Sequence, residues 1–257
     1  MKVSLLAPLA AALLLANPAS ARVWKAPEGC EVFMTVQSRS CSVSNYYTCQ
    51  GDAAGDQWRA DFDQEGIFFR SRINYETQWV ESFDINPPDR QYLVEGAADP
   101  ASFSELIAKG RDDFEFSLQR DSGLFTTVQG YDALTGESVT IDGMPLLQTE
   151  FEFAEYDEAG NEHRAGRGFE YVSPELRLFF SGPGEVKIDG EWLPIDSSPM
   201  DFIHPGETGF GSTQPLYDCD ALTAQTFEPL RPQKVAQPQM TKVQVRPALY
   251  QPASPKE

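Results

Sequence analysis

The chain of 257 residues is poor in metal-binding and cofactor-binding patterns. It contains two histidines, His163 and His204, and four cysteines, none of which form a Cys-x-x-Cys pair. Structural zinc sites commonly use such pairs, so zinc is not favoured. The stretch Gly182–Gly184 is too short for a phosphate loop and lacks a following Lys-Ser or Lys-Thr, so it is interpreted as a turn. We therefore expect no cofactor and no metal.

Long apolar runs are also absent. The longest covers Val3–Ala16, which is shorter than the roughly 20 residues that span a bilayer. It follows Lys2 and precedes the small residues Ala19–Ala21, a pattern typical of a secretory signal peptide cleaved after Ala21. No cysteine follows that cleavage site, so a lipid anchor is not indicated. We expect residues 1–21 to be a signal peptide and the mature protein to be periplasmic or secreted, and not membrane-spanning.

Basic residues are few and unevenly placed. The chain has 20 basic and 39 acidic residues, a net charge of −19. Residues 22–230 hold 14 basic and 38 acidic residues, a net charge of −24, whereas residues 231–257 hold five basic and one acidic. An acidic body repels phosphate backbones, so we expect no nucleic-acid partner. The acidity is interpreted as solvated surface. The alternatives are capture of a cationic partner or a divalent metal, and docking of the basic tail on the body or an anionic envelope surface.

The four cysteines predict two disulfides, because an even number in an exported chain favours bridges over metal ligation. A hairpin loop at Ser38–Ser40, centred between Arg39 and Ser40, would place Val36 opposite Val43 and Cys30 opposite Cys49. Directly opposed residues at non-hydrogen-bonded sites have Cα atoms about 4.5 Å apart, within disulfide range. Cys30–Cys49 is therefore predicted, which leaves Cys41 for Cys219.

Alternating polar and apolar residues predict a mainly β, antiparallel fold. The run 67–83 keeps this alternation so long that it predicts one long curved strand or two strands joined without a loop. Asp142-Gly143 and Asp189-Gly190 lie between strand-like segments, and the second matches a two-residue type I′ hairpin. The other strand-like segments are 31–37, 42–48, 57–62, 113–119, 147–153, 168–172 and 175–181.

One helix is predicted near Asp99–Lys109, with Asp99 as N-cap, Pro100 in the first turn and Gly110 at the C-terminus. Phe103, Leu106 and Ile107 would form its apolar stripe and place it against the sheet as a lid or plug. Residues 231–257 are Pro-rich and lack apolar clustering, which predicts a disordered tail. We therefore expect a single β-rich domain over residues 22–230, built on a large curved antiparallel sheet that is barrel-like, a half-barrel or a sandwich.

Two local patterns could indicate chemistry. Asp61–Gly66 copies the first half of a calcium loop, but position twelve is Arg72 instead of Glu, so a hairpin turn is the preferred interpretation. His204 precedes a glycine-rich loop and could act as a general base with a nearby Ser or carboxylate. Ser212 does not lie in a Gly-x-Ser-x-Gly elbow.

Aromatic residues concentrate on one face of the predicted strands, and a single helix cannot cover a sheet of that size. A large curved sheet either closes or leaves a concave apolar surface that can bind a ligand. Trp58, Phe69, Tyr75, Trp79, Phe103 and Ile107 are the candidate ligand-binding residues.

A long-stranded sheet with one lid helix is similar in architecture to the half-barrel carriers that move lipids across a bacterial periplasm. We expect a non-enzymatic exported protein that binds an apolar, lipid-like molecule or an envelope component; its oligomeric state is left open. The alternatives are a secreted hydrolase that uses His204 and a structural interaction module that acts through its tail.

Overall fold

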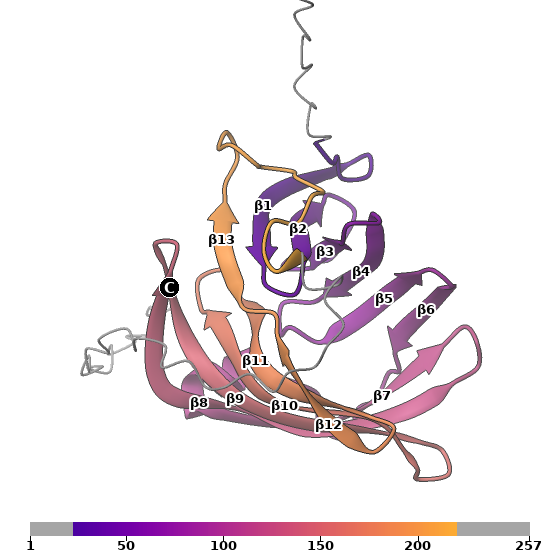
Figure 1. Cartoon of the computed structure of the whole chain (residues 1–257). Coiled ribbons are helices and arrows are strands. Elements are labelled where there is room, and N and C mark those ends of the chain that lie inside the picture. Colours follow the sequence, from indigo (N-terminus) through magenta and orange to yellow (C-terminus); the bar gives the residue numbers. More distant parts are fainter. Residues whose placement is uncertain (1–22, 220–257) are drawn as a thin grey trace, which may run out of the picture.

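The computed structural model describes residues 23–219, which form one antiparallel sheet and one short helix (Figure 1). The expected signal peptide, the boundary at residue 230 and the basic tail lie outside this range. The helix is α1 (Phe103–Lys109). The strands are β1 (Cys30–Ser38), β2 (Ser42–Cys49), β3 (Gln57–Phe62), β4 (Ile67–Ile73), β5 (Trp79–Ile85), β6 (Pro88–Leu93), β7 (Arg111–Arg120), β8 (Phe125–Ile141), β9 (Met144–Asp157), β10 (Glu162–Ser173), β11 (Leu178–Ile188), β12 (Glu191–Asp196) and β13 (Pro199–Ile203).

The sheet is a meander with one exception at its end. Each strand from β1 to β11 pairs with the next in the sequence, and β13 returns to pair with β1. The edges are therefore β12 and β13, which do not pair with each other, so the sheet is open. Figure 1 shows the first strands curled above the long strands β8 to β11. The prediction of a mainly β, antiparallel fold with one short helix is confirmed.

Several strand predictions need correction. The run 67–83 is not continuous, because the loop 74–78 separates β4 from β5. Asn74 closes this loop: its side chain accepts hydrogen bonds from the backbone N–H groups of Glu76 and Gln78. The period-two pattern also gives no prediction for β6 or β13. For β8, the longest strand at 17 residues, the sequence pattern indicates only the last residues, beside Asp142.

The turn chemistry follows the sequence closely. Asp142 and Gly143 connect β8 to β9 with φ of 45° and 80°, and Asp189 and Gly190 connect β11 to β12 with φ of 51° and 84°. Two consecutive positive φ values define a type I′ turn, whose twist matches the flanking strands. The segment Asp61–Gly66, which resembles the start of a calcium-binding loop, is a hairpin turn between β3 and β4 as expected. The Asp63 carboxylate accepts hydrogen bonds there from the N–H groups of Glu65 and Gly66.

The helix begins later than the sequence predicts. Ser102, not Asp99, is the N-cap, and its hydroxyl accepts a hydrogen bond from the N–H of Glu105. Asp99 instead forms an isolated bridge with Glu115 of β7, so the chain is extended before the helix starts. Gly110 ends the helix with φ 83°, as predicted. Within residues 23–219 no helix has the length and apolar character needed to cross a membrane.

Both predicted disulfides are present, with Cα–Cα separations of 4.0 Å for Cys30–Cys49 and 4.5 Å for Cys41–Cys219. The register that predicted the first is only partly right. Cys30 does face Cys49, but Val36 faces Ser44 instead of Val43. A bulge at Phe33 adds one residue to β1 and restores the expected pairing at the cysteines.

The curl of the sheet is fixed by a core between its two ends. Tyr46 of β2 and Phe202 of β13 both pack edge to face against Phe180 of β11, with ring centroids 5.9 Å and 5.0 Å apart. The N–H of Phe202 donates to the Asp142 carboxylate in the β8–β9 turn at 2.9 Å. A second core lies within the first strands, around Val43, Tyr47, Ala60 and Phe62.

Buried polar side chains hold the segment that follows β13. Gln37 donates to the carbonyl of Gln214 and accepts from the N–H of Leu216. Thr35 accepts from the N–H of Gly211. This segment ends at Cys219, so the second disulfide completes its attachment to the first hairpin.

The two disulfides should differ in their contribution to stability. The chain-entropy relation gives about 5 kcal/mol for the Cys41–Cys219 loop and about 3 kcal/mol for the Cys30–Cys49 loop. In urea unfolding, the double variant Cys41→Ser/Cys219→Ser should therefore lose about 2 kcal/mol more than Cys30→Ser/Cys49→Ser. Equal losses, or the reverse order, would show that the long bridge does not restrain the unfolded chain as this relation assumes.

Candidate functional site

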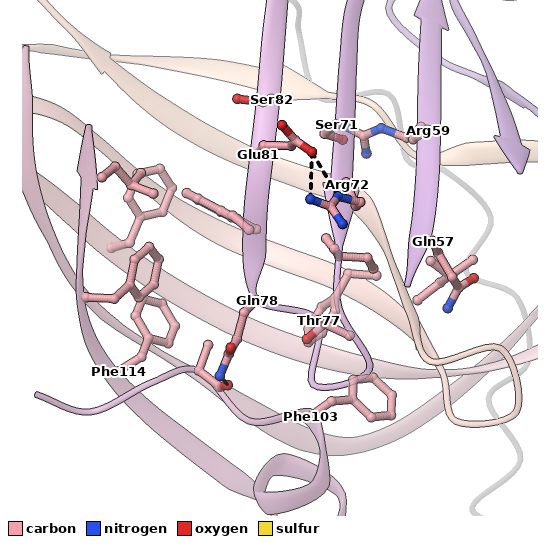
Figure 2. Close-up of a pocket in the computed structure, with 18 of the residues that line it drawn as sticks. Gln57, Arg59, Ser71, Arg72, Thr77, Gln78, Glu81, Ser82, Phe103 and Phe114 are labelled. Carbon is pink, nitrogen blue, oxygen red and sulfur yellow. Dashed lines mark hydrogen bonds and ion pairs between the residues drawn. The ribbon is translucent and has the colours of Figure 1, made fainter. Parts of the chain in front are cut away.

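A cavity of about 390 Å³ lies inside the curl of the sheet. Every strand from β2 to β11 and helix α1 contribute to its wall. Figure 2 shows side chains from these elements around the cavity, with Phe103 of α1 at one end and Phe114 of β7 at one side. The volume falls within the range of about 300–1,000 Å³ that is usual for small-molecule sites.

One wall of the cavity is aromatic. Trp79 of β5 packs edge to face against Phe116 of β7 and Phe153 of β9, with ring centroids 5.7 Å and 6.3 Å apart. Trp79 is 42% exposed despite these contacts, so a large part of the indole is open to the cavity or its mouth. The other aromatic residues of the wall are Tyr46, Trp58, Phe69, Phe103, Phe114, Phe151 and Phe179.

Two glycines create the space for the ring of Phe153. Gly130 of β8 and Gly166 of β10 face Phe153 from either side of β9. A Cβ at Gly130 would lie 2.8 Å from Phe153 Cβ, and a Cβ at Gly166 would lie 2.7 Å from Phe153 Cε1. A side chain at Gly166 would displace the Phe153 ring, and one at Gly130 would clash with Phe153 Cβ and the Phe114 ring, so both glycines help to shape this wall.

Helix α1 covers one end of the cavity. Phe103 and Leu106 are buried and line the cavity, and the Phe103 ring packs edge to face on Phe179 of β11. Glu76, in the β4–β5 loop, accepts hydrogen bonds from the N–H and hydroxyl of Ser104 and from the hydroxyl of Ser102. Burial raises the pKa of Glu76, but these hydrogen bonds and the charge of Arg177 outweigh it and lower the pKa overall. The start of the helix is thus fixed by an ionised carboxylate.

Four arginines line the cavity, and each is already paired with a carboxylate. Arg72 contacts Asp56 at 2.9 Å and Glu81 at 2.7 Å, and Figure 2 shows Arg72 and Glu81 pointing toward one another. The remaining pairs are Arg59–Asp61 at 3.0 Å, Arg120–Asp84 at 2.7 Å and Arg164–Glu155 at 3.2 Å. The Arg59 contact lacks the direction of a hydrogen bond, so it is an ion pair only.

Three carboxyl groups form a row on the cavity side of β7, β8 and β10. Asp112 faces Asp132 directly, and Glu170 lies two strands from Asp132, across β9. Asp112 accepts a hydrogen bond from the N–H of Ser102 at 2.8 Å. Asp132 and Glu170 have no side-chain hydrogen bond or ion pair with any residue between 23 and 219, so they are the unmatched charged groups of the described cavity wall.

Burial raises the pKa of all three carboxyl groups. The pKa of Asp112 rises to about 6 through burial, with the Ser102 hydrogen bond opposing the rise. The pKa of Asp132 rises to about 7 through burial and the neighbouring Asp112. The pKa of Glu170 rises to about 8 through burial and the neighbouring Asp132, partly offset by Arg59. This part of the cavity therefore gains or loses protons near neutral pH.

The structure places four of the six candidate ligand-binding residues in the cavity wall: Trp58, Phe69, Trp79 and Phe103. The indole N–H of Trp58 already has a partner, because Nε1 donates a hydrogen bond to the Asp52 carboxylate at 2.7 Å. Tyr75 and Ile107 are not part of the wall and are 53% and 37% exposed. Tyr75 instead lies under the guanidinium of Arg177, which is 3.7 Å from its ring centroid.

Sequence periodicity misses the charged part of the cavity. Glu170 and Arg59 lie on strand positions whose charge predicts a solvent-facing side, yet both line the cavity. Asp132 lies in the part of β8 that no pattern indicates. The carboxyl groups of Asp112, Asp132 and Glu170 come together through the pairing register of β7 to β10. Local sequence patterns do not indicate that register.

His204 lies apart from the cavity. It is exposed in the turn after β13, and within residues 23–219 its ring makes no hydrogen bond or ion pair. Its backbone N–H donates to the Glu207 carboxylate. The Ser212 hydroxyl donates to the carbonyl of Gln214 and not to His204. In the same range, no group of three or more His, Cys, Asp or Glu side chains is arranged to hold a metal ion.

Comparisons with family models, with curated proteins and with solved structures find no match for the chain. The functional argument therefore rests on the cavity itself.

The raised pKa values predict that stability decreases with pH. Asp132 and Glu170 have ordinary pKa values of 3.8 and 4.5, and in the fold these values are higher. The folded state therefore binds more protons than the unfolded state, and the stability from these groups is complete below about pH 4 and is lost as pH rises toward 7–8. The free energy of unfolding should fall by on the order of 2 kcal/mol between pH 5 and pH 8.

Urea unfolding at both pH values measures this decrease. The variant Asp132→Asn/Glu170→Gln should show a smaller decrease, because its two sites do not titrate. The exposed pair Asp121→Asn/Glu150→Gln makes the same chemical change outside the cavity and should behave as the unsubstituted protein does. The same decrease in all three proteins would contradict the assignment.

Proposed function

We propose that the protein binds an apolar, lipid-like small molecule in the cavity beneath α1 and acts as a non-enzymatic exported carrier. The observation that carries this proposal is the aromatic-lined space of about 390 Å³ with a helix over one end. The core around Phe180 and the core around Val43 adjoin this space, because Tyr46 of the first and Trp58 beside the second also line the cavity. The cavity is thus the open space that these packed cores and the aromatic residues of β7 and β9 leave between them.

The chemistry of the wall supports an apolar ligand body. Trp79 and the phenylalanines of β7 and β9 offer ring faces and edges, which contribute apolar area and defined geometry to binding. The lid helix contributes Phe103 and Leu106 at one end of the cavity. An apolar molecule here would contact protein on several sides, which is typical of small-molecule sites.

The two disulfides support an oxidising compartment, in agreement with the periplasmic or secreted location expected from the sequence. An exported binding protein would meet its ligand in the envelope or outside the cell.

A substitution that fills the cavity tests this proposal. Ser82 of β5 lines the cavity, and Ser82→Phe would place a ring in the space that the ligand needs. The same substitution at exposed Ser138 of β8 adds a ring outside the cavity. Titration with Nile red, a neutral apolar dye, should show affinity reduced by about ten-fold or more for Ser82→Phe and unchanged for Ser138→Phe. Equal affinity in both variants would place the dye elsewhere and count against the cavity.

A second substitution separates binding from hydrolysis. His204→Ala should leave Nile red affinity and thermal stability unchanged, because the ring is exposed and makes no contact with the cavity. Dye titration and a thermal melt measure this. If the protein hydrolyses an ester substrate and His204→Ala abolishes that activity, the hydrolase alternative replaces the carrier.

A further inference from the structure

The unmatched carboxyl groups of the cavity indicate what its ligand carries at the polar end. Asp132 and Glu170 line the cavity, and the charge of Asp132 contributes to the raised pKa of Glu170. Neither has a side-chain hydrogen bond or ion pair within residues 23–219. Both residues are half-buried in the cavity wall, where a charged group without a protein partner loses part of its hydration at a cost in free energy.

The positive charges of the wall are unavailable for an anionic ligand. Arg59, Arg72, Arg120 and Arg164 each have a carboxylate within 3.2 Å. A fatty acid or a phosphate ester would have to displace one of these carboxylates and leave it buried without its cation. A cationic ligand would have no such cost at Asp132 and Glu170, because neither carboxyl group has an ion pair within residues 23–219 and Arg59 acts on Glu170 only from beyond ion-pair distance.

Aromatic rings surround the same region. Phe151 faces Asp132 on the neighbouring strand, and Phe151 and Phe153 stack with ring centroids 6.3 Å apart. Ring faces attract cations, so the phenylalanines favour a positively charged group beside the carboxylates and an apolar body farther along the wall.

We propose that the ligand of this cavity is an apolar amine, whose ammonium group is held by the carboxylates of Asp132 and Glu170 while its apolar body lies against Trp79, Phe116 and Phe153. This inference rests on the proposed function, because it specifies the ligand of the same cavity. The ammonium N–H groups donate hydrogen bonds to the two carboxylates, and each carboxyl group that was protonated releases its proton to water when the amine binds.

Binding should therefore strengthen as pH rises from about 5.5 to 8. The two carboxyl groups become charged over this range while an alkylamine remains protonated. The titratable and charged groups that face the pair are Asp112 on β7, Arg59 on β3 with its partner Asp61, Arg164 on β10, and Tyr46 on β2. Asp112 has a raised pKa and becomes charged over the same range, which adds to the attraction.

A panel of ligands with one chain and three head groups tests the proposal. Calorimetric titration with decylamine, decanol and decanoate, each below its micelle concentration, compares an ammonium, a hydroxyl and a carboxylate. At pH 8 the affinity for decylamine should exceed that for decanol by about ten-fold or more, which is the ratio expected for a hydrogen-bonded charge pair. Decanoate should bind most weakly. At pH 5.5 the advantage of decylamine should shrink, while decanol affinity stays constant.

Substitution assigns the effect to the pair. In Asp132→Asn/Glu170→Gln, decylamine should lose most of its advantage over decanol, with Asp112 supplying what remains, and decanol should bind as in the unsubstituted protein. The matched variant Asp121→Asn/Glu150→Gln removes the same charges from exposed positions and should keep the preference for decylamine. If the matched variant loses the preference as well, general attraction to the acidic body explains it and the proposal fails.

The outcomes separate this inference from the proposed function. Failure of Nile red and of all three decyl ligands to bind would overturn the apolar-ligand proposal itself. Binding of decanol with no advantage for decylamine would overturn only the ammonium assignment. Tighter binding of decanoate than of decylamine would also overturn the ammonium assignment. It would show that the ligand carboxylate replaces a protein carboxylate beside one of the cavity arginines.

Discussion

Phe202 of β13 packs against Phe180 of β11, although the two strands lie near opposite ends of the hydrogen-bonding order of the sheet. This contact, with Tyr46 and the apolar residues around it, holds the curl that encloses the cavity. Burial of each large side chain contributes about 1.5–3 kcal/mol. The open edges β12 and β13 are not joined by backbone hydrogen bonds, so side-chain packing replaces the ladder that would close a barrel.

The curl explains why the cavity is both apolar and charged. Ala60 and Phe62 lie on one face of β3 and belong to the core of the first strands. The opposite face, with Gln57 and Arg59, then lies toward the cavity. The long strands β7 to β10 contribute the phenylalanines from the other side. A single twisted sheet that bends over itself therefore places polar positions of one region opposite apolar positions of another.

Charge inside such a space is costly unless it is compensated. Arginine–carboxylate pairs compensate most of it here, and Arg72 illustrates the arrangement with Asp56 and Glu81 on two sides. Asp132 and Glu170 are the exception in the described wall. Their raised pKa values show how the fold tolerates them: near neutral pH they can hold protons and avoid buried negative charge. A site that can change its charge in this way is suited to a ligand that supplies a counter-charge.

Local chemistry determined much of the fold. Period-two alternation marks most of the strands, and the Asp-Gly pairs require the positive φ values of type I′ turns. The pairing of Cys30 with Cys49 follows from hairpin geometry, although the assumed centre of the loop misplaces the register by one residue near the turn and a bulge at Phe33 restores it at the cysteines. Helix α1 was indicated by its apolar stripe. Its start was misjudged, because Asp99 pairs with Glu115 in the tertiary structure.

Only the tertiary structure decided which side chains meet in the cavity. Trp58, Phe69, Trp79 and Phe103 could be named from the aromatic pattern, but Tyr75 and Ile107 carry the same signal and lie outside the cavity wall. Asp132 and Glu170 are 38 positions apart and come together through the register of β8, β9 and β10. A sequence encodes the preference of each residue for a strand or a turn. The face that a strand turns toward a cavity depends on the curl of the whole sheet, which is set by contacts between strands that are not neighbours in it, such as Tyr46 with Phe180 and Phe180 with Phe202.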